Sequence, residues 1–153
     1  MDNYHSLVDL IIKDEMDGKP NHERILDIGG TPKYLIDYAG FPNLRMAIKA
    51  SVISKACFDH GVSKSLLKRL PDIISSPKCV FKPADPCHVD SVVVLTLEFK
   101  GMHPLIVPLR MRQQVGRGNI FNLVSSVYGK EGPDPESKWK KQGLLIYEPN
   151  RST

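Results

Sequence analysis

The chain has few cysteines, and the three it has are not spaced for a metal site or a disulfide framework. Cys57, Cys79 and Cys87 form an odd set and contain no CxxC pair. Small disulfide-stabilised domains usually carry an even number of cysteines, and zinc knuckles need closely spaced pairs. Cys87 and His88 are adjacent, which suits one metal ion poorly. We therefore expect reduced, buried cysteines, no metal site and no other cofactor.

Long apolar runs are also missing. No stretch approaches the ~20 consecutive apolar residues that a membrane-spanning helix needs. Residues 1–18, MDNYHSLVDLIIKDEMDG, are acidic and amphipathic, and they lack the basic start and the small-residue cleavage site of a secretory signal. The sequence therefore predicts a cytoplasmic protein, in the producing or the target cell, without a signal peptide and without a membrane partner.

The length and charge of the chain fit a single globular domain. Its 153 residues, of which 41% are hydrophobic and 25% charged, suffice for a sizeable core. The chain has 21 Lys and Arg against 17 Asp and Glu, a net charge of +4. This excess favours an anionic partner without identifying one. The oligomeric state is left open by these features.

The hydrophobic pattern changes near the middle of the chain. Helical spacing predicts helices over residues 3–16, 33–38, 44–59 and 63–70, one more turn at 72–75, and a loop over 17–32. Alternation then predicts strands over 91–99, 104–112, 119–129 and 143–148, with a short helix before the last strand. This order indicates an α+β fold in which N-terminal helices pack on one face of a C-terminal antiparallel sheet of about four or five strands. We expect one domain over 1–153, with an N-terminal helix and loop (1–27), a helical part (28–78) and a sheet part (79–148).

Alternation along the predicted strands separates an apolar face from a polar one. The polar face gathers Thr96, Glu98, Arg110, Arg112, Asn122, Ser126 and Tyr128. An ordinary solvated surface explains such a face, because water wets the open side of an antiparallel sheet. The two arginines also fit a phosphate, since a guanidinium group matches phosphate oxygens in geometry.

Lys55 and His60 lie at the end of the predicted helix 44–59. Lys55 falls among apolar positions, so its ammonium either extends past the core into water or reaches an anionic partner. His60 precedes Gly61, which we expect in the left-handed conformation that ends a helix. The carbonyl groups at a helix C-terminus favour a protonated imidazole, so His60 fits either a simple capping role or an acid–base role.

Several short motifs resemble one known group of proteins. They are IGGTPKYL (28–35), the lysine and HGVS of residues 55–63, RLPDIISSPKCVF (69–81), and SSVYGK (125–130) followed by WKKQGLLIYE (139–148). Together they resemble phage-associated toxin domains of the barnase–EndoU–colicin–RelE-like nuclease superfamily, over residues 28–148. The resemblance implies a metal-independent ribonuclease that cleaves tRNA or other cellular RNA, and a cognate immunity protein or antitoxin as a partner.

The resemblance and the polar face together assign roles to individual residues. His60 would act as general acid or base, Lys55 and Arg110 would stabilise the phosphate, and Ser126 and Tyr128 would bind the phosphate or orient the base. The predicted product is a 2′,3′-cyclic phosphate. Further substrate-binding candidates are Arg112, Ser125, Lys130, Thr96, Glu98 and Trp139. Trp139 lies within ESKWKKQ, where it could stack on a base or anchor a polar helix to the core.

Two other interpretations stay open. CFDHGVSKSLLKRLP (57–71) has the spacing of a DNA-binding helix-turn-helix with residues 63–70 as its recognition helix, although Pro71 limits that helix to about two turns. A sheet that only binds another protein is the third possibility.

Overall fold

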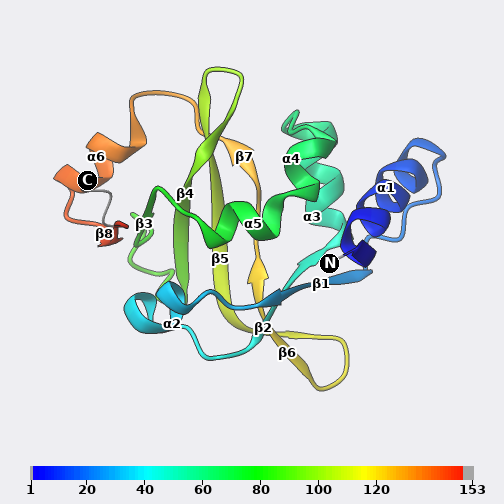
Figure 1. Ribbon diagram of the computed structural model, residues 1–153, viewed down its shortest axis with the longest axis horizontal. Coiled ribbons are helices and arrows are strands. Elements are labelled where there is room, and N and C mark those ends of the chain that lie inside the picture. The colour runs from blue at the N-terminus through cyan, green and yellow to red at the C-terminus, as the bar shows by residue number, and fades with distance from the viewer. Residues whose placement is uncertain (1, 150–153) are drawn as a thin grey trace.

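The computed structural model describes residues 2–149, which form one mixed sheet flanked by helices (Figure 1). Within this range the strands are β1 (Ile25–Gly30), β2 (Arg45–Lys49), β3 (Cys79–Phe81), β4 (Ser91–Lys100), β5 (His103–Val115), β6 (Asn119–Val124), β7 (Tyr128–Gly129) and β8 (Leu145–Tyr147). The helices are α1 (Asp2–Met16), α2 (Lys33–Ala39), α3 (Ala50–Ser54), the π-helix η1 (Lys55–Asp59), α4 (Lys64–Lys68), α5 (Leu70–Ser75) and α6 (Pro135–Lys141). Among residues 2–149, no helix combines the length and the hydrophobicity of a membrane-spanning segment.

The α+β class predicted from the sequence is confirmed, but the sheet is larger than expected. Its order is β1-β2-β6-β5-β4-β3-β8, with β7 paired to β5, so the described residues hold eight strands instead of four or five. Neighbouring strands are antiparallel except β2 and β6, which are parallel. The N-terminal half therefore contributes two strands to the sheet as well as helices.

The predicted helix over 44–59 is wrong in its first half. Residues 45–49 form β2, whose Met46, Ala47 and Ile48 are all buried, and the helix begins only at Ala50. A strand that is covered on both faces is apolar at every position, so its sequence lacks the alternation that distinguishes a strand from a helix. β1 likewise lies in the segment expected to be a loop.

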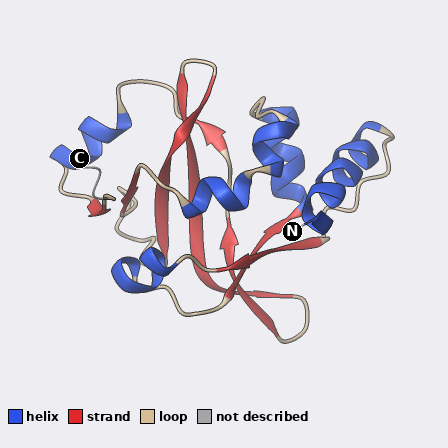
Figure 2. Ribbon diagram, viewed as in Figure 1, coloured by secondary structure: helices blue, strands red, loops and turns tan. Residues whose placement is uncertain are grey.

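Helices cover both faces of the sheet, not one. Leu70 and Ile74 of α5 join Val80, Val94 and Val107 in the main core, and α5 crosses the face of β4 and β5 (Figure 2). On the opposite face Cys79, Phe81, Leu95 and Ile106 form a second cluster that Trp139 of α6 partly covers. The Trp139 ring is set edge-on to Phe81 at 5.2 Å, so it packs against this cluster as the anchoring interpretation requires.

Local signals fixed the helix ends better than the strands. The Ser63 hydroxyl accepts a hydrogen bond from the Leu66 N–H at 3.2 Å and caps α4, and the Asp134 carboxylate caps α6 by accepting from Glu136. Gly61 has a φ of +66°, the left-handed conformation expected for it. The Gly61 conformation could be predicted because this short-range rule needs no knowledge of the tertiary structure.

Candidate functional site

The end of η1 meets β7 at one corner of the sheet, which we call the β7 corner and define by His60, Lys100, His103, Tyr128 and Lys130. The rings of His60 and Tyr128 lie 5.6 Å apart at an angle of 45°. Two residues that are 68 positions apart in the sequence therefore form a direct contact, as their joint prediction required. Burial raises the pKa of Tyr128, so its hydroxyl stays protonated at neutral pH.

The backbone at the end of η1 sets the position of His60. The His60 N–H donates to the Lys55 carbonyl at 3.0 Å, and the Val62 N–H donates to the Ala56 carbonyl at 2.9 Å. These wide turns differ from the normal helical repeat, and π-helical turns of this kind are frequent at functional sites. The left-handed Gly61 then ends the helix, leaving His60 half-buried against β7.

Lys100 joins this corner from the β4–β5 hairpin, and the sequence analysis missed it. A Cβ atom added at Gly129 would lie 3.1 Å from the Cβ atoms of both Lys100 and His103. A Cβ atom added at Gly61 would lie 3.0 Å from the Lys100 Cε and 3.4 Å from its Nζ. The Lys100 side chain therefore passes over β7 and ends beside the turn that follows His60. The glycines in the HG and YG pairs were the available signal, because they mark where another chain segment approaches closely.

A groove of about 430 Å³ adjoins the β7 corner, and we call it the hairpin groove. It is lined by Lys78, Leu95, Thr96, Leu97, Phe99, Met102, His103, Pro104, Lys130, Gly132, Asp134 and Pro135. Leu97, Phe99 and Met102 are large apolar side chains with 46%, 55% and 92% of their surface exposed. Alternation places Leu97 and Phe99 opposite the polar-face residues Thr96 and Glu98, on the apolar face, so their exposure is a finding of the structure.

The β7 corner is positively charged. Within residues 2–149, no carboxylate lies within 4 Å of the ammonium groups of Lys55, Lys100 or Lys130. Lys55 is exposed, as the interpretation of a solvated side chain required, while its carbonyl holds the His60 N–H. The corner thus offers cations and an imidazole beside an apolar groove.

The predicted arginines do not lie at this corner. Arg110 Nη2 is 3.1 Å from Asp90 Oδ2, and Arg110 stands four residues beyond Ile106, the β5 partner of Tyr128. Four residues of strand measure about 13 Å, so Arg110 is too far away to share a phosphate with His60. Arg112 lies still further along β5, at a bulge with a φ of +52°.

Thr96 and Glu98 were assigned to the wrong face. The pairs Val94–Val107 and Leu95–Ile106 place Leu95, not Val94, on the Arg110 side of the sheet. Glu98 instead binds Arg69, at 3.1 Å, and the buried Thr96 hydroxyl donates to the Leu105 carbonyl at 2.8 Å. Both faces of β4 are apolar near its centre, so alternation could not tell which one the helices cover.

The predicted face of residues 119–124 was inverted in the same way. Val124 is in the main core, and Asn122 is fully buried, where its amide donates to Thr31 Oγ1 at 2.7 Å and to the Pro42 carbonyl at 3.0 Å. The two serines lie in the short link between β6 and β7. The exposed Ser125 donates its backbone N–H to the Pro108 carbonyl, and Ser126 is half-buried. Their roles toward a ligand stay predictions.

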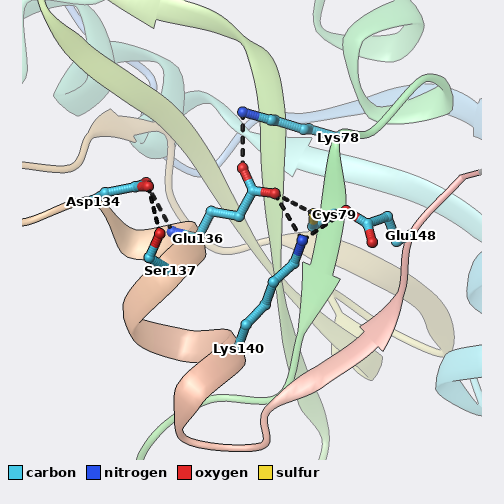
Figure 3. A network of polar contacts seen from close by, with 7 residues as sticks. All are labelled: Lys78, Cys79, Asp134, Glu136, Ser137, Lys140 and Glu148. Atoms are coloured by element: carbon cyan, nitrogen blue, oxygen red, sulfur yellow. Dashed lines mark hydrogen bonds and ion pairs between the residues drawn. The ribbon is translucent and has the colours of Figure 1, made fainter. Parts of the chain in front are cut away.

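A second polar cluster joins α6 and β8 to β3, and we call it the α6 network (Figure 3). The Glu136 carboxylate contacts Lys78 at 2.8 Å and Lys140 at 2.9 Å, and Lys140 contacts Glu148 at 2.8 Å. Cys79, Glu136 and Glu148 place three ligand atoms within 4.8 Å of one another, a spacing that a metal ion could use.

The chemistry of the α6 network fits a structural role better than a metal centre. The Lys140 ammonium already lies between the two carboxylates. Burial raises the pKa of the Cys79 thiol to about 12, which keeps it protonated and able to donate its one proton to either carboxylate. Cys79 is buried as expected, whereas Cys57 is half-buried and Cys87 is exposed in the loop before β4.

The helix-turn-helix interpretation receives no support from the structure. α4 spans only five residues, and Lys64 and Lys68 both contact Asp9 of α1, at 3.3 and 2.9 Å. Arg69, the third cation of the predicted recognition helix, is the residue that binds Glu98. These side chains hold the helices together instead of forming a free DNA-contacting surface.

Comparison with known proteins corrects the nuclease resemblance. A family model described as the phage MuF C-terminal domain matches residues 51–151, which is 101 of the 153 residues. No curated protein and no solved structure matches the chain. The assignment as a ribonuclease toxin that binds RNA was therefore wrong. Its motifs were short, and pairs such as HG and YG arise wherever a helix end or a strand passes close to another segment. The chain belongs to the phage MuF C-terminal domain family.

Proposed function

We propose that this chain is a phage structural or morphogenesis protein that binds another protein through the hairpin groove. The family match supports the association with a phage. The observation that carries the binding role is the exposure of Leu97, Phe99 and Met102 beside one groove. Contiguous exposed apolar surface of this kind is typical of a protein interaction site.

The energetics favour a partner with its own apolar side chains. Complete burial of a Leu, Phe or Met side chain contributes about 1.5–3 kcal/mol, so covering three of them supplies a substantial part of a binding free energy. Association also has entropic costs, which is why such anchors must lie together. In the hairpin groove they do, since all three line the same volume of about 430 Å³.

The charges at the rim define the partner further. Lys130 and His103 line the groove, and the Lys100 side chain lies next to His103. Asp134 is the carboxylate among the lining residues. A partner segment with apolar residues followed by an acidic one therefore complements the groove.

Catalysis by His60 and Tyr128, and an immunity partner, stay predictions from the sequence.

The test is whether the chain is part of phage particles and whether the groove is needed for this. Particles purified from a producing host contain the wild-type chain, detected by mass spectrometry, if the proposal holds. Met102→Asp and Phe99→Asp reduce the amount in particles at least fivefold, because a carboxylate in the groove cannot be buried without a partner.

Val89→Asp is the matched control, since Val89 is 86% exposed and lies outside the groove. Its incorporation stays at the wild-type level, and circular dichroism of all three variants checks that they fold. Absence of the wild-type chain from particles, or equal incorporation of the groove and control variants, would contradict the proposal.

A further inference from the structure

The positive charge of the chain is concentrated in one segment. Residues 99–130 contain five of the 21 Lys and Arg and none of the 17 Asp and Glu, so this segment carries +5 while the remainder carries −1. The segment comprises β5, β6 and β7 with their turns. These three strands, which follow one another in the sequence, therefore have no acidic side chain of their own.

The arginines of this segment differ in whether another element supplies a carboxylate. Arg110 is paired with Asp90, at 3.1 Å, just before β4. Arg112 and Arg117 are exposed, and no carboxylate lies within 4 Å of either guanidinium among residues 2–149. Both belong to the β5–β6 hairpin, which leaves this hairpin with two free guanidinium groups.

The backbone at Arg112 is held in a defined conformation by a buried side chain. Arg112 has a φ of +52°, which is unusual for a residue with a side chain, and its N–H donates to the Asn122 Oδ1 at 3.2 Å. Asn122 is fully buried and is itself fixed by Thr31 and Pro42. Such strain persists only where surrounding contacts impose it, and it is most often found at functional sites. Arg117 lies between Gly116 and Gly118, whose φ angles of +63° and +79° form the tight turn at the hairpin tip.

The shape of the hairpin fits a groove of double-stranded DNA. Figure 1 shows the β5–β6 hairpin extending beyond the other strands as a two-stranded ribbon. The major groove of B-form DNA is wide enough to admit such a ribbon. Gln114 and Asn119, on opposite strands near the tip, are exposed and add hydrogen-bonding groups to the same surface.

The acidic residues beside the tip of the hairpin are balanced by nearby cations. Glu23 and Asp27 line a hollow of about 420 Å³ together with Gln114 and Asn119. Asp27 binds Arg45 at 2.6 Å, and Lys49 lines the same hollow as Glu23. The hollow is therefore close to neutral, and it does not cancel the charge of the tip.

We propose that the β5–β6 hairpin binds double-stranded DNA, with Arg112 and Arg117 contacting backbone phosphates. Contacts of this type are independent of sequence and release bound cations, so affinity falls as salt rises. The proposal does not depend on the hairpin groove. That groove lies beside the β4–β5 hairpin, near the opposite end of β5.

The experiment measures binding of the full chain to a fluorescein-labelled, mixed-sequence duplex of about 20 base pairs by fluorescence anisotropy, between about 50 and 200 mM salt. The wild-type chain binds, and its log K falls linearly with log salt. The variant R112Q/R117Q lowers the steepness of this line by about 1.8, since each phosphate contact contributes about 0.9. R110Q is the matched control on the same strand, and because its guanidinium is already paired it changes the slope by less than about 0.5.

Three results would overturn the proposal. They are no duplex binding at about 50 mM salt, an R110Q variant that loses as much slope as the double variant, and equal affinity for a single strand of the same sequence. If replacement of Arg112 disrupts folding, R117Q alone decides the question, because Arg117 is at the hairpin tip. R117Q then lowers the steepness of log K against log salt by about 0.9, and an unchanged slope contradicts the proposal.

Discussion

The α6 network and the β5–β6 hairpin both carry closely spaced cations. Those of the α6 network are paired with carboxylates, whereas two of those in the hairpin are not. In the α6 network Lys78 and Lys140 each lie within 3 Å of a carboxylate, and the contacts join three separate elements. In the hairpin Arg112 and Arg117 have no carboxylate within 4 Å among the described residues. Paired cations hold secondary structure elements together, whereas unpaired ones are available for a ligand. The same distinction separates Arg110 from its neighbour Arg112 on a single strand.

The largest expected effect is at Asn122, the buried side chain that holds the backbone of the β5–β6 hairpin at Arg112. Asn122→Ala removes three hydrogen bonds at a fully buried position and leaves the Arg112 N–H without its acceptor. We expect a loss of about 3 kcal/mol in the free energy of unfolding, measured with urea. A loss below about 1 kcal/mol would show that Asn122 does not hold Arg112 in place.

The second largest expected effect is at Glu136 of the α6 network, and it depends on pH. Lys78 and Lys140 lower the pKa of Glu136 from about 4.5 to about 2. A carboxyl group with a depressed folded-state pKa stabilises the fold above its unfolded pKa, and this contribution is lost as pH falls from about 4.5 to about 2. Glu136→Gln should therefore lower the free energy of unfolding by about 1–2 kcal/mol at pH 7 and by almost nothing near pH 2.

Glu131→Gln provides the control for this measurement. Glu131 is exposed, and no ion pair joins it to another described residue, so its replacement should change stability by less than about 0.5 kcal/mol at either pH. If the two glutamine variants behaved alike across the pH range, the α6 network would not stabilise the fold.

The smallest effect concerns Lys100, an unpaired cation that packing holds in position. Gly61→Ala places a residue with a side chain at a φ of +66° and brings its Cβ to 3.0 Å from the Lys100 Cε. We expect a cost of about 1 kcal/mol, measured by urea unfolding. Gly18→Ala isolates the backbone part of this cost, because Gly18 has a φ of +73° and open space around it.

The difference between these two glycine variants should disappear when Lys100 is replaced by Ala. If the full difference persists without the Lys100 side chain, this lysine is not packed against the end of η1. Lys100 would then not belong to the β7 corner.

Sequence reasoning predicted local features well and the sheet only in part. The helix end at Gly61 and the strands within residues 91–124 follow from short-range chemistry and alternation. β2 could not be predicted, because burial on both faces removes the alternation. The face of Thr96 and Glu98 depends on which side of β4 the helices cover, a tertiary property that one strand does not encode.

The candidate site was predictable to a smaller extent. His60 and Tyr128 were chosen for a ribonuclease that the family match contradicts, yet they do lie in contact. Lys100 and His103 reach the same corner only because the β4–β5 hairpin folds across β7. The pairing of Arg110 with Asp90, and the lack of a partner for Arg112, depend on sheet register and on a bulge. Composition alone gives the charge of these residues and not their neighbours.

The measurement that tests this account most directly compares two double variants that each remove two positive charges. Urea unfolding at pH 7 is measured for K78Q/K140Q and for R112Q/R117Q. We predict a clear loss of stability for the lysine variant, because Glu136 and Glu148 lose their partners, and a change within about 0.5 kcal/mol for the arginine variant. Equal losses, or a larger loss for the arginine variant, would contradict the division of the molecule into paired structural charges and free ligand-facing ones.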